Sequence, residues 1–276
     1  MGAAANQAGG IYIDGVDNAV FGAPFAGGEN IISGNTGYGI RIENGDQSVI
    51  LRNYIGIARD GITSLPNGAN GIEILGQAFD NEIGGPVFYA RAAGLAPFTN
   101  ANWIANNAGH GIVLGNTGGN DPDANMLYQN AIYANGGLGI DLGNDGVDIN
   151  DPGDGDDGPN GHQNYPVLSG VTGSPILTVT LQSEGDREYD IDLFRNQTCD
   201  PSGYGEGQGY ITTIMITTDT SGNVATDIDL RGLASPGDNI TALARGDLGV
   251  TSEFSNCVTL IGVDHTYSTF VPFVQH

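Results

Sequence analysis

Lysine is absent from this 276-residue chain, so its 8 basic residues are all arginines. They are outnumbered by 32 acidic residues, and the formal net charge is −24. A field of this sign repels phosphate backbones, which argues against a nucleic-acid partner. It attracts cations instead, and calcium, which prefers carboxylate and carbonyl oxygens, fits best. The alternative is that the acidity serves solubility alone.

Long hydrophobic runs are also missing. No stretch approaches the roughly 20 apolar residues of a membrane helix, so no membrane span is expected. The first ten residues, MGAAANQAGG, lack the basic start and apolar centre of a secretion signal. We therefore expect that a signal has been removed or that the chain is a piece of a longer one.

Cysteine is scarce, since only Cys199 and Cys257 occur, both in the last third of the chain. Two thiols alone are too few for a typical structural metal site. We interpret them as a disulfide, which indicates an oxidising compartment and an extracellular or cell-surface location.

Glycine, in contrast, is abundant, and it opens a repeated phrase of the type Gly-Ile-x-Ile or Gly-Ile-x-Leu. A second phrase, seen as NIISGN, NWIANN and NMLYQN and more weakly as SVILRN, falls between the copies. Insertions stretch the repeat, because its intervals are 29, 32, 40 and 28 residues. The copies of the first phrase begin at Gly10, Gly39, Gly71, Gly111 and Gly139.

Each phrase is too short for a helix and is bounded by Gly, Asn or Asp, which indicates short strands joined by tight turns. Such units bury their apolar face only by stacking coil on coil, at about 4.8 Å per coil. Asparagines at equivalent turns are then expected to form hydrogen-bonded ladders. The sequence therefore predicts an all-β fold that begins with a right-handed parallel β-helix over residues 1–162, with an Asp-rich junction loop at 141–162.

The pattern changes over residues 163–262, where apolar and polar residues alternate in about seven segments such as PILTVTLQS and EYDIDLFRN. This alternation, punctuated by Gly, Pro and Asp, predicts an antiparallel β-sandwich of immunoglobulin-like size. Residues 263–276 follow as an apolar tail strand.

Several segments resemble a known family. ENIISGNTGYGIRI, RNYIGIARDGITSLPNGANGIEI and DNEIGG are similar to repeats of secreted bacterial right-handed β-helix proteins of the pectate-lyase-like superfamily. GIDLGNDGVDINDPGDGDDGPNGHQNYPVL resembles the passage from such a helix into a C-terminal β-sandwich, and TSEFSNC resembles the closing strand of that sandwich. The resemblance implies the architecture but assigns no function, because most members look like surface proteins without an assigned role.

The densest group of acidic residues lies between Asp141 and Asp157, with seven aspartates and no positive charge. Unneutralised carboxylates at this density repel one another, and a divalent cation removes that repulsion. Alternating oxygen ligands with glycines between them suit calcium, although the EF-hand pattern is missing. The alternative is a solvated acidic linker. We predict a calcium site whose ligands are Asp145, Asp148, Asn150, Asp151, Asp154 and Asp156.

The 40-residue interval carries the insertion GGPVFYARAAGLAPFTNANW, which gathers aromatic residues around an arginine. Loops that extend from solenoids are common binding positions, and this composition suits sugar rings that bear acidic groups. The alternative is an apolar lid over the helix, with Trp103 in the core. The predicted carbohydrate-binding residues are Phe88, Tyr89, Arg91 and Phe98.

An enzymatic role is the rival interpretation, namely a polysaccharide lyase or glycoside hydrolase acting on an acidic glycan through the β-helix face. The outward column of the Gly-Ile-x-Ile strands offers Arg41 beside Glu73, which also suits a simple surface ion pair. His110 and His162 each stand alone, which usually indicates a structural histidine, and no pattern of a serine or cysteine nucleophile is visible. We therefore predict no catalytic residues.

The C-terminal tail HTYSTFVPFVQH is apolar and nearly uncharged. Such a segment either folds onto its own sandwich or adds to the edge of a neighbouring copy, which would give head-to-tail filaments. The sequence as a whole indicates a calcium-stabilised, non-catalytic surface, scaffold or adhesive protein, whose partners are further copies, upstream β-helix coils or an extracellular polysaccharide. The predicted self-association residues are Phe270, Val271, Phe273 and Val274.

Overall fold

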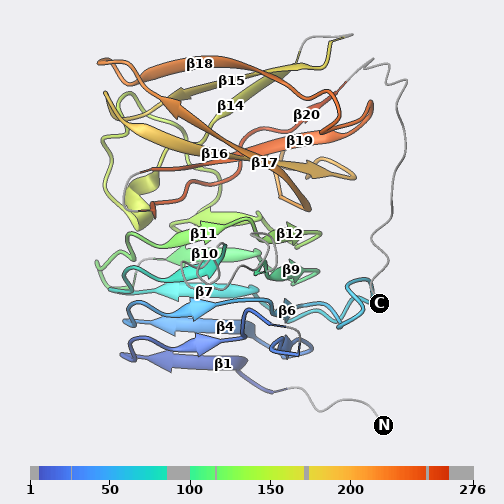
Figure 1. The fold of residues 1–276 in the computed structure, drawn as a ribbon. Coiled ribbons are helices and arrows are strands. Elements are labelled where there is room, and N and C mark those ends of the chain that lie inside the picture. The colour runs from blue at the N-terminus through green and yellow to red at the C-terminus, as the bar shows by residue number, and fades with distance from the viewer. Residues whose placement is uncertain are drawn as a thin grey trace.

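The structure is a computed structural model, and it describes residues 6–25, 27–85, 100–115, 117–170, 174–246 and 249–260. Figure 1 shows stacked parallel coils below a group of antiparallel strands. The prediction of an all-β chain that begins with a parallel β-helix is confirmed. No helix among the described residues is long and apolar enough to cross a membrane.

Three parallel sheets run along the stack, and each coil contributes one strand to a sheet. The first sheet holds β1 (Gly9–Asp14), β4 (Tyr38–Glu43), β7 (Ile72–Leu75), β10 (Ile112–Gly115) and β13 (Ile140–Leu142). The second holds β2 (Val20–Phe21), β5 (Val49–Ile50), β8 (Glu82–Gly84) and β11 (Met126–Tyr128). The third holds β3 (Ile31–Ile32), β6 (Tyr54–Ile55), β9 (Trp103–Ala105) and β12 (Ala131–Tyr133).

The Gly-Ile-x-Ile repeat supplies the strands of the first sheet in register, because Ile72 pairs with Ile40 on one side and with Ile112 on the other. The repeated glycine is required by close packing between coils. A Cβ atom on Gly39 would lie 2.5 Å from the carbonyl oxygen of Gly71, and the equivalent clash recurs along the stack. Isoleucines from all three sheets fill one buried core.

Asparagine ladders join the coils at their corners, as the sequence predicts. Buried Asn67 donates from Nδ2 to Asn107 Oδ1 at 2.9 Å, and its own Oδ1 accepts from the backbone N–H and the Nδ2 of Asn35. Each rung thus satisfies backbone groups that the turn leaves unpaired. The three ladders contain Asn35, Asn67, Asn107 and Asn135; Asn30, Asn53, Asn102 and Asn130; and Ser48, Asn81, Asn125 and Asn160.

Seven antiparallel strands follow in two sheets that share a second hydrophobic core. The short 3-10 helix η1 (Pro159–His162) precedes them. One sheet has the order β14 (Val167–Gly170), β15 (Ile176–Gln182), β18 (Asn223–Asp229). The other has the order β17 (Gly209–Thr217), β16 (Glu188–Asn196), β19 (Asn239–Arg245), β20 (Val258–Thr259).

The antiparallel part closes the end of the solenoid. Phe194 and Phe254 belong to the same core cluster as the solenoid isoleucines. Side chains also take the place of a further coil, since Glu253 Oε1 accepts from the N–H of Leu142 at 3.0 Å and Glu206 Oε1 accepts from the N–H of Asn135 at 2.9 Å. The solenoid and its cap are therefore joined by apolar and polar contacts.

The predicted disulfide is present between Cys199 and Cys257, whose Cα atoms are 5.8 Å apart. It links the segment after β16 to the segment before β20 and closes a loop with a sequence separation of 58 residues.

The ladders yield a stability prediction. Asn67→Ala removes four hydrogen bonds at a buried site and leaves their partners unsatisfied, so we expect a loss of about 3 kcal/mol or more in the free energy of unfolding. Denaturant unfolding of the variant measures this loss. The control is exposed Asn120→Ala, which should change stability by less than about 0.5 kcal/mol. Equal stability of the two variants would contradict the structural role of the ladder.

Candidate functional site

The acidic loop lies between the last solenoid strand and the first antiparallel strand. Its two arms are tied together, because Asn150 and Tyr165 exchange two hydrogen bonds and Asn164 bonds the backbone of Asp151 twice. These contacts bend the segment into a closed loop beside η1. The loop is therefore an ordered part of the junction rather than a loose connection.

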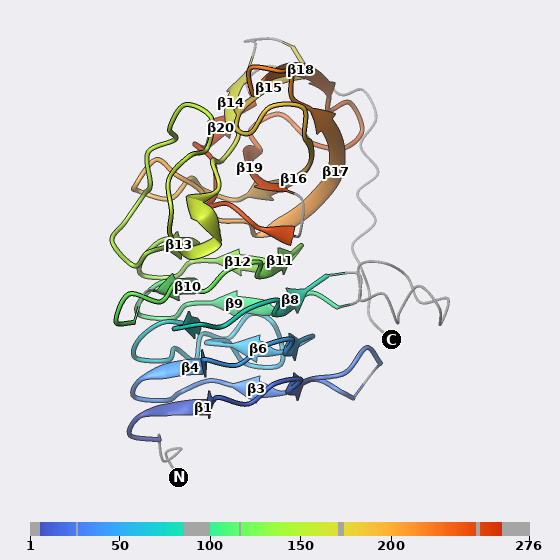
Figure 2. The same ribbon diagram turned by 90° about the vertical axis from the view of Figure 1, so that its left-hand side faces the viewer.

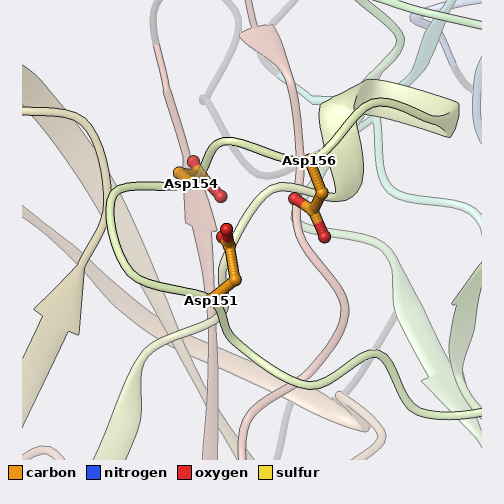
Figure 3. Close-up of side chains that lie close together, drawn as sticks. All are labelled: Asp151, Asp154 and Asp156. Atoms are coloured by element: carbon orange, nitrogen blue, oxygen red, sulfur yellow. The ribbon is translucent and has the colours of Figure 1, made fainter.

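Three aspartates of this loop come together. One carboxylate oxygen from each of Asp151, Asp154 and Asp156 lies within 4.8 Å of the other two. Figure 3 shows their carboxylates around a common space. Asp151 and Asp154 are half-buried and Asp156 is exposed. Within the described chain, the Asp156 carboxylate has no hydrogen-bond partner, which leaves its oxygens available to a cation.

Asp154 has a second role, because it anchors the loop to the antiparallel part. Its Oδ1 accepts from the N–H of Asn164 at 2.7 Å, and its Oδ2 accepts from Gln163 Nε2 at 2.7 Å and from the hydroxyl of Ser183. Burial raises the pKa of Asp154, while the Ser183 and Asn164 donors oppose that shift. The cluster therefore contains one carboxylate with structural contacts and one, Asp156, without them.

The other three predicted ligands, Asp145, Asp148 and Asn150, lie outside this cluster and make other contacts. Asp148 faces His162, with 2.9 Å between Oδ2 and Nδ1, and burial raises the pKa of Asp148 to about 6. The side-chain amide of Asn150 bonds the backbone of Tyr165, and the N–H of Asp145 donates to the Oδ1 of Asp141. The structure thus gathers three of the six predicted residues into one cluster.

Two cavities adjoin this loop. The larger cavity has a volume of about 860 Å³, and Asp154 and Asp156 both line it. A second cavity, of about 610 Å³, shares the lining residues Asp123, Asp157 and Gly161 with it. Glu184 on the wall of the larger cavity forms an ion pair with Arg187, with 3.0 Å between Oε2 and Nε. The cluster therefore borders an open, acidic surface at the junction.

Two glutamates at the junction escaped sequence reasoning. Glu253, almost fully buried, accepts backbone N–H groups from Leu142 and Asp148, yet its burial still raises its pKa to about 8. Glu206 caps Ala134 and Asn135 in the same way. Glu253 belongs to the segment TSEFSNC, where nothing local marks a glutamate that caps a strand more than 100 residues earlier.

The predicted carbohydrate residues Phe88, Tyr89, Arg91 and Phe98 lie outside the described residues, as do Phe270, Val271, Phe273 and Val274 of the tail. Trp103 is described, and it is not in the core. Its ring stacks on Tyr54 on the outside of the third sheet, with 4.9 Å between ring centroids and 10° between planes, while Ile104 points inward.

The outward column of the first sheet holds contacts that suit a structural role. Arg41 and Glu73 form an ion pair at 2.6 Å, and Asn70 donates to the second oxygen of Glu73. Farther up the column, Asp141 lies 3.3 Å from His110 Nδ1, which itself accepts from the N–H of Leu138. Both oxygens of Glu73 are thus engaged, whereas the buried Oδ2 of Asp141 has no hydrogen-bond partner among the described residues.

Glu82 gives a pH prediction. It lies between Val49 and Met126 on the outside of the second sheet, and burial raises its pKa to about 7 from an ordinary value of 4.5. The folded state then binds this proton more tightly than the unfolded chain, so the contribution of Glu82 to stability falls as the pH rises through this interval. Glu82→Gln should raise the unfolding free energy at pH 8 by about 1–3 kcal/mol.

Unfolding at pH 4.5 and at pH 8 measures the effect, and the gain from Glu82→Gln should nearly vanish at the lower pH. The matched control is Glu188→Gln, at an exposed position of β16, for which we expect little change at either pH. A gain from Glu82→Gln that is equal at both pH values would show that the carboxyl group does not titrate as stated.

Comparison with known proteins adds little to this description. Neither a protein-family model nor a curated protein matches the chain. A solved structure, the enzymatically active domain of tailspike protein 2 of bacteriophage CBA120, matches at 14% identity and a TM-score of 0.24. The match covers 94% of this chain and 49% of that one, so this chain spans about half its length. At this TM-score the match carries no argument about fold or function.

Proposed function

We propose that the chain is a calcium-stabilised, non-catalytic scaffold or adhesive module of the extracellular space. In the same proposal its β-helix is right-handed and of the pectate-lyase-like kind, and its antiparallel part is an immunoglobulin-like sandwich. The observation that carries the proposal is the position of Asp151, Asp154 and Asp156 at the junction, where one of them also anchors the antiparallel part. The disulfide supports an oxidising, extracellular location.

The chemistry of the cluster fits calcium. Carboxylate oxygens are hard ligands, which calcium prefers, and three negative charges within 4.8 Å repel one another unless a cation neutralises them. Asp156 is the clearest candidate ligand, because its carboxylate has no competing donor in the described chain. Among the described residues, the carboxylate of Asp151 accepts only from the N–H of Gly155, at 3.2 and 3.3 Å, and so retains further acceptor capacity.

A cation bound here would act as a clamp. Asp151 is tied to Asn164, and Asp154 is tied to Ser183 at the end of β15, so the cluster connects the loop to the first strands of the antiparallel part. Neutralising the carboxylates would remove a repulsion that strains these connections. The expected effect of calcium is therefore greater stability of the junction rather than chemistry on a substrate.

This role predicts a calcium-dependent melting temperature. Added calcium should raise the melting temperature of the purified chain and a chelator should reverse the rise, because a ligand that binds only the folded state stabilises it. Asp156→Asn should abolish the response and leave the chain without calcium at least as stable as before, since it removes one of the three repelling charges and no hydrogen bond. Isothermal titration calorimetry with calcium checks the binding directly.

The choice of variant matters, because Asp154→Ala would destabilise the junction even without a cation. Asp157→Asn, one residue from Asp156 and outside the cluster, is the matched control and should keep the calcium response. A melting temperature and calorimetric trace that are indifferent to calcium would contradict the clamp.

A carbohydrate partner is a second candidate, favoured by the Tyr54–Trp103 stack. The residue that pairs with Trp103 in the next coil is Ala131, whose side chain is too small to cover the Trp103 ring. Arg52 and Glu29, which precede β6 and β3 of the same sheet, form an ion pair at 2.6 Å, and Arg59, whose side chain is 69% exposed, lies 3.7 Å from Glu29. Aromatic faces beside hydrogen-bonding groups suit neutral sugar rings.

Trp103 is the only tryptophan of the chain, so its fluorescence reports on this position alone. Titration with maltohexaose and with cellohexaose should change the emission with at least one of them, and Tyr54→Ala should weaken the binding. Tyr12→Ala, an exposed tyrosine on the first sheet, is the control. Emission that stays constant with both oligosaccharides would remove the support for this surface.

A further inference from the structure

Among the described strands, β17 lies at an edge of the antiparallel part, and its one irregularity is a β-bulge at Ile211, between the pairs Phe194–Tyr210 and Leu193–Thr212. It is the first strand in the order β17, β16, β19, β20 and pairs only with β16 among the described strands. Figure 2 shows it at the right-hand margin of the antiparallel part. An edge strand presents a row of unpaired N–H and C=O groups, which can pair with another strand.

The other edges of the two antiparallel sheets carry the usual protection. β14 has 4 residues and follows Pro166, and β20 has 2 residues. β18 has 7 residues but carries Asp227 and Asp229. Short length, proline and charge all discourage pairing between molecules.

β17 has none of these features. Its 9 residues, GYITTIMIT, contain no charged side chain and no proline. Met215 is 68% exposed, and Thr217 is exposed as well. Isoleucine, threonine and tyrosine have high strand propensity, so the segment is well suited to pair along its free side. Among the described antiparallel strands, it alone is a long and uncharged edge.

We propose that β17 pairs with β17 of a second copy of this chain, antiparallel and about a two-fold axis. This inference does not depend on calcium or carbohydrate binding. The two four-stranded sheets would then continue into one sheet across the dimer. A two-fold contact presents the same segment on both sides, and it closes after two copies instead of propagating.

The charge of the chain limits where two copies can meet. With a net charge of −24, most surfaces of two copies repel each other, and β17 offers a contact without charged side chains. In β16, Glu188 pairs with Thr217 at one end of β17 and Arg195 pairs with Gly209 at the other end. When two β17 strands pair antiparallel, the Thr217 end of one copy lies beside the Gly209 end of the other. Glu188 of one copy and Arg195 of the other are therefore at the same end of the joined sheet.

Sedimentation of the full-length chain tests the proposal. We expect its mass to rise with concentration from 28.5 kDa toward twice that value. Met215→Asp puts two like charges into the contact and should weaken association at least about tenfold. Ala225→Asp adds the same charge at an exposed position of β18 and should leave association unchanged. Circular dichroism confirms that each variant is folded.

Hydrogen exchange supplies a second readout on the unaltered chain. The backbone amides of β17 should exchange more slowly as the protein concentration rises, whereas those of β18 should not. A chain that stays monomeric with unchanged β17 exchange overturns the proposal, and so does association that Met215→Asp leaves intact. Dimers that form only after deletion of residues 261–276 would show that the chain's own tail covers this edge, which also overturns it.

Discussion

Each coil of the solenoid depends on the next, because the N–H and C=O groups of its strands have no partner within the coil itself. Where the chain turns, asparagine side chains replace the missing strand pairs, and each amide bonds the equivalent amide one coil away. The close approach of coils explains the repeated glycine as well, since any side chain at Gly39 or Gly71 would meet a backbone carbonyl. The regular sequence is thus a consequence of satisfying the same backbone groups in every coil.

This dependence has to end somewhere, and the last coil shows how it ends. Glu206 and Glu253 accept the N–H groups that a further coil would have bonded, and Thr251 does the same for Leu127. Phe194 and Phe254 cover the apolar cross-section. The antiparallel part is therefore a structural component of the solenoid as well as a unit with its own core.

The carboxylates that cap the last solenoid coil place negative charge in the buried junction between the solenoid and the antiparallel part. Burial raises the pKa of Glu253 although two backbone donors oppose the shift, and Asp148 beside it is affected in the same direction. The cluster of Asp151, Asp154 and Asp156 adds further charge at the same junction. Electrostatic repulsion and the need for hydrogen-bond acceptors compete here, and a cation would relieve this competition.

Much of the architecture follows from the sequence alone, since a repeat stacks on copies of itself. The positions of the Gly-Ile-x-Ile phrases predict the in-register strands, and recurring asparagines predict the ladders. The same register could have placed Trp103 on the outside, because NIIS, NYIG and NWIA align Ile32, Ile55 and Ile104 as the inward residues. The alternation of apolar and polar residues likewise predicts the antiparallel strands. The two cysteines, 58 residues apart within this part of the chain, are compatible with the disulfide.

Only the tertiary structure decided which acidic residues act together. Six oxygen-bearing residues of the junction loop looked equivalent in sequence, but Asn150 bonds Tyr165 and Asp148 faces His162, so only three carboxylates converge. The capping roles of Glu206 and Glu253 are also invisible in sequence. Each depends on a contact between residues 71 to 111 positions apart, and no local pattern records which backbone N–H a distant carboxylate will reach.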